Sequence, residues 1–189
     1  MNKQSPINID TNQVQHEMIT IDIQLTGEVT DLNRKKHTLS LNPIGTVVIN
    51  HHAYKIINLH FHTPSEHTID GMFTKMEAHF VLEDAQKHHA VIAVMIEVGE
   101  ENAAFAEIFD LFEHGGTTLA HWHQLLPTTK TGYHYEGSLT TPPFTEGVSW
   151  YMLQHPITVS QAQLSHYQKD YQQTNRDCQP INHRTIYQF

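Results

Sequence analysis

The chain has 189 residues, a net charge of −9 with histidine neutral, and a hydrophobic share of 39%. This length suits one domain with a sizeable core, and no apolar stretch approaches the ~18 residues that a transmembrane helix needs. The longest basic run is residues 34–36, so neither nucleic acid nor an anionic membrane is expected as a partner, because no cationic surface is available to displace their counterions.

Alternating or β-branched residues predict strands along most of the chain. The segments concerned are 18–25, 37–41, 46–49, 54–62, 75–82, 90–98 and 148–153. Turn-forming residues separate them, among them residues 42–45 and the pair Asp70-Gly71. The run 90–98 is apolar almost throughout, which is typical of a strand that is buried on both faces in the centre of a sheet.

Two helices are predicted beside these strands. Asn102 is suited to cap a helix over residues 103–113, which ends before two glycines. Ser160 and Gln163 form a capping-box pattern that opens a second helix, running to about residue 172. We therefore predict a mainly β fold of the α+β kind. It forms a single domain over residues 1–189, around a central, largely antiparallel twisted sheet with a few short peripheral helices.

Three histidines and one carboxylate are placed to meet on one face of this sheet. His60 and His62 are two residues apart in a predicted strand, so their side chains project to the same side. Glu77 and His79 share a face in the same way, and pairing of the two strands would bring the four groups together. Three imidazoles around Zn²⁺ leave the fourth position open for water, as in catalytic zinc sites.

An alternative interpretation is that these histidines are close together by chance. The chain has 17 histidines, and other close pairs occur at 51–52, 88–89 and 121/123. A histidine-rich chain could also bind several metal ions loosely. The triad differs from the other pairs because it lies in apolar, strand-like segments, where an unpartnered imidazole would be costly to bury.

A second candidate element is the segment 137–143, which ends in Pro142-Pro143. Each proline fixes its own φ and restricts the residue before it, which predicts a stiff, non-helical loop carrying Thr140. The loop could simply connect two strands. A fixed hydroxyl could instead orient a metal-bound water by accepting a hydrogen bond from it. For this, the hydroxyl must donate its own hydrogen bond to a buried carboxylate such as Glu66.

Five motifs together resemble the α-class carbonic anhydrases, and the chain is similar to bacterial members of that class. The motifs are QSPINI (4–9), LHFHTPSEHTID (59–70), EAH (77–79), GSLTTPP (137–143) and NHR (182–184). The resemblance implies a zinc enzyme that hydrates CO₂ reversibly to bicarbonate and a proton through a zinc-bound hydroxide. It also implies that His60, His62 and His79 bind the zinc, that Thr140 accepts a hydrogen bond from the hydroxide, and that Glu66 receives the threonine proton.

The resemblance assigns further residues around this centre. The resemblance implies a hydrogen-bond partner for each ligand histidine: Glu77 for His79, Asn58 for His60 and the backbone of Asn182 for His62. Asn58 stands where the family usually has glutamine. The implied apolar wall of the CO₂ pocket consists of Val81, Val91, Leu139 and Trp150, with Thr141 near the bicarbonate position. His67 and Tyr135 resemble a buried structural pair. His37 aligns with the proton shuttle of the family, although Lys35-Lys36 replaces the usual Asn-Gly and an ordinary exposed histidine is the alternative.

Two departures from the family pattern bear on location. Only three residues precede Gln4, where relatives carry an aromatic-rich stretch and often an export signal, and Phe144 stands where exported members have a cysteine. The single Cys178 excludes an internal disulfide. These features lead us to expect a cytoplasmic protein, with a periplasmic or secreted location as the alternative if a preceding segment exists.

The sequence leaves one functional alternative open, which is a catalytically weakened or silent carbonic-anhydrase-like zinc protein. The expected partners are CO₂ and bicarbonate, inhibitory anions and primary sulfonamides, with no nucleic acid or membrane. The oligomeric state stays open, with a homodimer as one arrangement.

Overall fold

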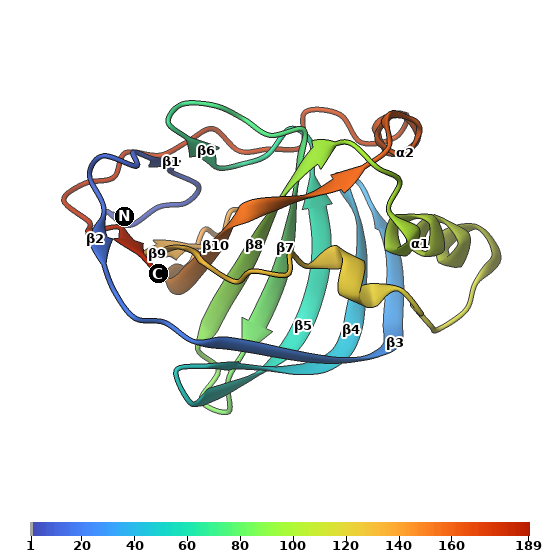
Figure 1. Cartoon of the computed structure of the whole chain (residues 1–189), viewed down its shortest axis with the longest axis horizontal. Helices are drawn as coiled ribbons and strands as arrows, with labels where there is room; N and C mark the ends of the chain where they lie inside the picture. Colours follow the sequence, from blue (N-terminus) through green and yellow to red (C-terminus); the bar gives the residue numbers. More distant parts are fainter. Residues whose placement is uncertain (1) are drawn as a thin grey trace.

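A large mixed sheet forms the centre of the computed structural model, which describes residues 2–189 (Figure 1). Within these residues the sheet has nine strands. Their order is β2 (Gln15–His16), β11 (Tyr187–Gln188), β9 (Gly132–Ser138), β10 (Glu146–Val159), β8 (His89–Val98), β7 (Met76–Glu83), β5 (His52–His62), β4 (Thr38–Ile49) and β3 (Ile21–Lys35). Only the pairs β10–β8 and β11–β2 are parallel. The prediction of a mainly β, largely antiparallel fold is therefore confirmed.

The remaining elements are short and lie around the sheet. Strands β1 (Asn8–Ile9) and β6 (Thr68–Ile69) form a small parallel pair. The helices are α1 (Ala103–His114), the 3₁₀ turn η1 (Trp122–Leu125) and α2 (Gln161–Gln168). In the part of the chain that the structure describes, none of these helices has the length and apolar run that crossing a bilayer requires.

The sheet separates two hydrophobic clusters. The larger one contains Leu59 and Phe61 of β5 and packs against buried residues of α1, η1 and α2, among them Phe105. The smaller one contains Ile7, Trp150 and other residues from the N-terminal segment, β8, β9 and β10. Because side chains alternate along a strand, His60 and His62, which alternate with Leu59 and Phe61 after the register shift between Ile56 and Asn58, face away from the larger cluster. This alternation places the histidine triad on the face of the smaller cluster.

Strand β8 lies near the middle of the sheet, between β7 and β10, and is buried on both faces. Its alternate residues enter different clusters, Ile92 and Val94 the larger one, Val91 and Ala93 the smaller one. This confirms the interpretation of its apolar sequence.

Two predicted strands, 37–41 and 46–49, prove to be one, because residues 38–41 and 46–49 both fall within β4 and only His37 lies before it. The predicted turn at 42–45 is a register shift in β4, where the pairing with β5 is interrupted between Leu41 and Thr46. Pro43 lacks an N–H to donate, which is tolerated where a strand bulges. The turn residues thus mark an irregularity inside a strand.

Other boundaries also differ from prediction. Strand β3 runs from Ile21 to Lys35, well beyond the predicted residue 25, and β9 is not predicted at all. Gly137 and Ser138 therefore belong to a strand, although the sequence places them in the loop. Helix α2 begins after Ser160 with the predicted capping box but ends at Gln168.

The caps of the two helices are joined through one side chain, Gln163. Its Oε1 accepts from the backbone N–H groups of Ser160 and Asn102, both at 3.0 Å, and its Nε2 donates to the Asn102 carbonyl at 2.7 Å. Gln163→Ala is expected to lower the free energy of unfolding by about 3 kcal/mol, because three largely buried hydrogen bonds are lost. Chemical denaturation measures this loss, and the exposed Gln161→Ala serves as the matched control. Equal stability of the two variants would contradict the prediction.

Candidate metal centre

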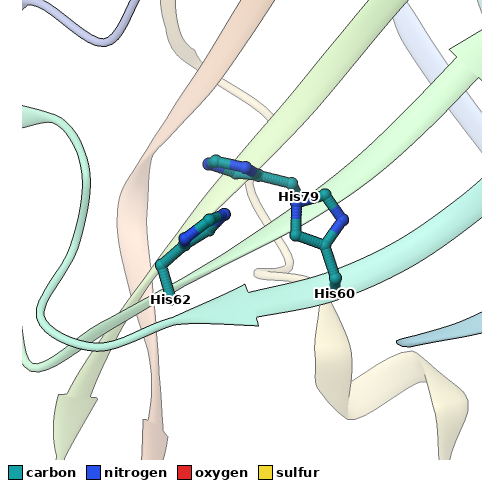
Figure 2. Close-up of side chains that lie close together, drawn as sticks. All are labelled: His60, His62 and His79. Carbon is teal, nitrogen blue, oxygen red and sulfur yellow. The ribbon is translucent and has the colours of Figure 1, made fainter. Parts of the chain in front are cut away.

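The register of β5 and β7 brings the three histidines together. His60 lies directly opposite His79, and His62 lies opposite Glu77. Residues opposite one another share a face of the sheet, so all four side chains converge. Figure 2 shows the three imidazole rings turned toward a common point. Their ligand nitrogens lie within 4.8 Å of one another.

Each imidazole has one ring nitrogen occupied by a hydrogen-bond acceptor. The three pairs are His60 Nδ1 with Asn58 Oδ1 (2.7 Å), His62 Nδ1 with the Thr174 carbonyl (3.0 Å) and His79 Nε2 with Glu77 Oε1 (2.8 Å). An acceptor at one nitrogen places the ring proton there and leaves the other nitrogen for a metal. The metal-facing atoms are therefore Nε2 of His60, Nε2 of His62 and Nδ1 of His79.

The predicted partner of His62 is wrong. Thr174, in the segment after α2, supplies the carbonyl that accepts from His62. Asn182 has an exposed side chain, which donates to the carbonyl of Asn2. The error arises because any residue can supply a backbone carbonyl, so residue type does not reveal which one does.

The prediction that Asn58 contacts His60 is confirmed, and the structure shows how the amide is oriented. Its Nδ2 donates to Ser40 Oγ and to Asn42 Oδ1 on the neighbouring strand β4. With the NH₂ group held there, Oδ1 faces the imidazole of His60. The shorter amide therefore reaches the histidine.

Glu77 is the central acceptor of this region and is fully buried. Its Oε1 accepts from His79 Nε2 (2.8 Å) and His67 Nδ1 (2.7 Å), and its Oε2 accepts from the backbone N–H groups of Glu66 and His67. Burial alone would raise the pKa of Glu77, but His67 and His79 hold it well below its usual range. His67 Nε2 also lies 2.6 Å from the Tyr135 hydroxyl, which confirms their contact as a buried pair.

Glu77→Gln is expected to weaken zinc binding about 10- to 100-fold, because an amide cannot accept on both sides and His79 loses a charged partner. Competition with a chromophoric chelator measures the zinc affinity. Glu83→Gln, near the far end of the same strand, is the matched control and should bind zinc as the unaltered chain does. Unchanged affinity in Glu77→Gln would contradict this role.

Two of the three imidazoles, those of His60 and His62, are held in the neutral form by burial. Burial, together with the charges of His62, His79 and Lys35, lowers the pKa of His60 well below its ordinary value. Burial also lowers the pKa of His62. Burial acts in the same direction on His79, but Glu77 outweighs it and raises that pKa. Neutral imidazole is the form that binds metal.

Two buried atoms at this site have no hydrogen-bond partner among the described residues, His62 Nε2 and Glu66 Oε2. They lie 3.6 Å apart, and Glu66 Oε2 is 3.9 Å from His79 Nδ1. Leaving buried polar atoms unpaired costs free energy, so a bound group that satisfies both is expected. A divalent cation with a bound water fits this donor set.

Comparison with known proteins identifies the family. The family model described as eukaryotic-type carbonic anhydrase matches residues 1–189. The chain belongs to this family. It is 36% identical to a carbonic anhydrase of Pectobacterium carotovorum, over 97% of this chain and 78% of that protein. A carbonic anhydrase of Neisseria gonorrhoeae is also 36% identical, with 97% and 76% covered.

Solved structures agree with this assignment. The α-carbonic anhydrase of Thermovibrio ammonificans, in complex with the inhibitor sulfanilamide, superposes with a TM-score of 0.88 at 31% identity. The match covers 98% of this chain and 87% of that one. The α-carbonic anhydrase of Photobacterium profundum gives a TM-score of 0.86 at 33% identity, with 98% and 89% covered.

In this carbonic anhydrase the predicted apolar residues form a row beside the triad. Val81 of β7 pairs with Val91 of β8, which pairs with Trp150 of β10. Trp150 is buried, and its ring centre lies 5.0 Å from that of His79. Leu139, at the start of the following loop, packs against the same cluster. The four residues thus belong to one apolar cluster beside the triad.

The Thr140 loop starts close to this cluster, because the Trp150 indole donates to the Ser138 carbonyl at 3.0 Å. Thr140 is partly exposed and Thr141 is exposed. The predicted hydrogen bond from Thr140 to Glu66 is not formed between the described residues, since Glu66 Oε2 has no partner. The two roles of Thr140, accepting a hydrogen bond from the reacting water and donating one to Glu66, therefore stay a prediction.

His37 lies in the two-residue turn between β3 and β4, with an exposed side chain. Ser40, three residues further on, pairs with His60, so the turn lies near the triad end of β4. The shuttle role of His37 remains a prediction. The sequence did not point to Thr174 or to Arg176, whose backbone N–H donates to Glu66 Oε1 at 2.9 Å.

Proposed function

We propose that this carbonic anhydrase binds one zinc ion at His60, His62 and His79 and hydrates CO₂ reversibly to bicarbonate and a proton. The observation that carries the proposal is the convergence of three oriented imidazoles beside Glu66 Oε2, a buried carboxylate oxygen that has no partner among the described residues. When bound, zinc supplies the Lewis acidity that makes water a nucleophile near neutral pH, for which carbonic anhydrases are the standard case.

The remaining residues bind and orient. The row of Val81, Val91 and Trp150 offers an apolar surface on which CO₂, a nonpolar molecule, can rest beside the triad. The hydroxyl oxygen of Thr140 accepts a hydrogen bond from the reacting water, and the hydroxyl donates its own hydrogen bond to Glu66 Oε2. Together these bonds fix the direction of the lone pair on the water oxygen. His37 takes the product proton to solvent.

The same site should bind inhibitors that carry a negative charge, such as small anions and deprotonated primary sulfonamides. A related α-carbonic anhydrase is known in complex with sulfanilamide, which supports this expectation. The alternative of a silent zinc-binding protein is less favoured, because the complete triad, Thr140 and Glu66 are all present.

Stopped-flow measurement of CO₂ hydration tests the proposal. The chain loaded with zinc should accelerate hydration, a strong chelator should remove the activity, and added zinc should restore it. Metal analysis should find one zinc per chain, against several weakly bound equivalents for a histidine-rich metal buffer. A zinc-loaded chain without activity above the buffer rate would contradict the proposed function.

A further inference from the structure

An arginine from the C-terminal segment packs against the loop that carries Thr140. The guanidinium carbon of Arg176 lies 3.9 Å from the centre of the Phe144 ring. A guanidinium over an aromatic face is attracted by the ring's electron density, and partial burial strengthens the contact. Both side chains are partly buried. The contact joins two residues that are 32 positions apart in the sequence.

The backbone of Phe144 adopts a conformation that needs support. Its φ is +61°, in the left-handed region, where a bulky residue without other contacts is strained. Its N–H donates to the Thr141 carbonyl at 2.9 Å, which closes a turn over the two prolines. Its carbonyl accepts from Gln4 Nε2 at 3.2 Å. The Arg176 contact on the ring is a third attachment.

Arg176 also binds the segment that anchors both ends of the loop. Its Nη1 donates to the Ser5 carbonyl at 2.7 Å and to Gln4 Oε1 at 3.1 Å. Ser5 exchanges two hydrogen bonds with Ser138 before the loop, and Gln4 Nε2 donates to Glu146 after it, at 2.9 Å. Arg176 therefore contacts both the loop, at Phe144, and the N-terminal segment that anchors the loop, at Gln4 and Ser5.

The same residue reaches Glu66, the carboxylate beside the histidine triad. The backbone N–H of Arg176 donates to Glu66 Oε1 at 2.9 Å, while Oε2 stays without a partner among the described residues. One residue thus holds the carboxylate through its main chain and the Thr140 loop through its side chain.

We propose that Arg176 and Phe144 form a positioning pair that sets the Thr140 hydroxyl relative to Glu66. This inference rests on the proposed function, which gives Thr140 its part in the reaction. The pair acts through Thr140: Arg176 fixes the ring of Phe144, and Phe144 fixes the loop four residues after Thr140.

Steady-state CO₂ hydration by zinc-loaded variants tests this pair. Phe144→Leu and Phe144→Gly remove the aromatic face and are expected to lower kcat/KM about five- to tenfold, the order that one partly buried cation–π contact supplies. Phe144→Tyr keeps the face and should retain the rate. Glycine also relieves the positive φ, so Phe144→Gly should unfold at no lower temperature than the unaltered chain. Its loss of rate would then not come from instability.

A double-mutant cycle separates positioning from general support. In a Thr140→Ala background, Phe144→Leu should cause no further loss, because Phe144 acts on the rate through the Thr140 hydroxyl, which is already absent. Zinc content should remain one per chain throughout.

The inference would be overturned by an equal loss with and without Thr140, by no loss in Phe144→Leu, or by an equal loss in Phe144→Tyr. Each of these results leaves the proposed function intact if the unaltered chain is active. An inactive, zinc-loaded, unaltered chain would instead contradict the proposed function itself.

Discussion

His79→Ala is expected to abolish both zinc retention and CO₂ hydration. His79 supplies one of three metal-facing nitrogens, and its other nitrogen donates a hydrogen bond to the buried carboxylate of Glu77. Removing it leaves two imidazoles and takes away one of the four hydrogen bonds that the buried Glu77 accepts, which weakens the metal site and the fold around it. Metal analysis after dialysis and stopped-flow assays at saturating zinc measure the two losses.

The matched control for this variant is His155→Ala, which removes an exposed histidine. It should keep one zinc per chain and full activity. A histidine-rich metal buffer would lose a similar, small share of its metal in either variant. Zinc retention in His79→Ala would therefore contradict the assignment of the triad.

Thr140→Ala is expected to keep the zinc and lose about 100-fold in kcat/KM, the size of effect that misorientation of a reacting group produces. The change removes a hydroxyl and leaves all three ligand histidines in place. Thr140→Ser restores the hydroxyl and should recover most of the rate. Zinc analysis and stopped-flow kinetics on the same samples separate metal loss from loss of orientation.

Thr145→Ala provides a control in the same loop, since Thr145 is exposed and contributes its backbone carbonyl to Leu139. It should hydrate CO₂ at the rate of the unaltered chain. If Thr140→Ala retained full activity, Thr140 would not be the residue that orients the reacting water.

The fold and the triad could be predicted because their determinants are local. Alternation along β5 and β7 places His60, His62 and His79 on common faces, and the capping residues Asn102 and Ser160 mark the starts of both helices. Each of these features depends on residues within a few positions of one another. They are the ones that the structure confirms.

The missed features depend on long-range contacts or on the backbone. Strand β9 contains two glycines and a histidine, and its pairing with β10 rather than its own composition makes it a strand. Thr174 acts through a carbonyl that any residue could supply. Arg176 is identified only once the C-terminal segment is folded against Glu66 and Phe144. The roles of Thr140 and His37, the cytoplasmic location and a homodimer remain predictions.

The most direct test of the central claim is anomalous diffraction at the zinc absorption edge from crystals of the zinc-loaded chain. The hydrogen-bonded nitrogens identify which atoms should face the metal. We predict one strong peak, bound by Nε2 of His60, Nε2 of His62 and Nδ1 of His79. A peak at His67 and Glu77, or at exposed histidines only, would contradict this account of the site.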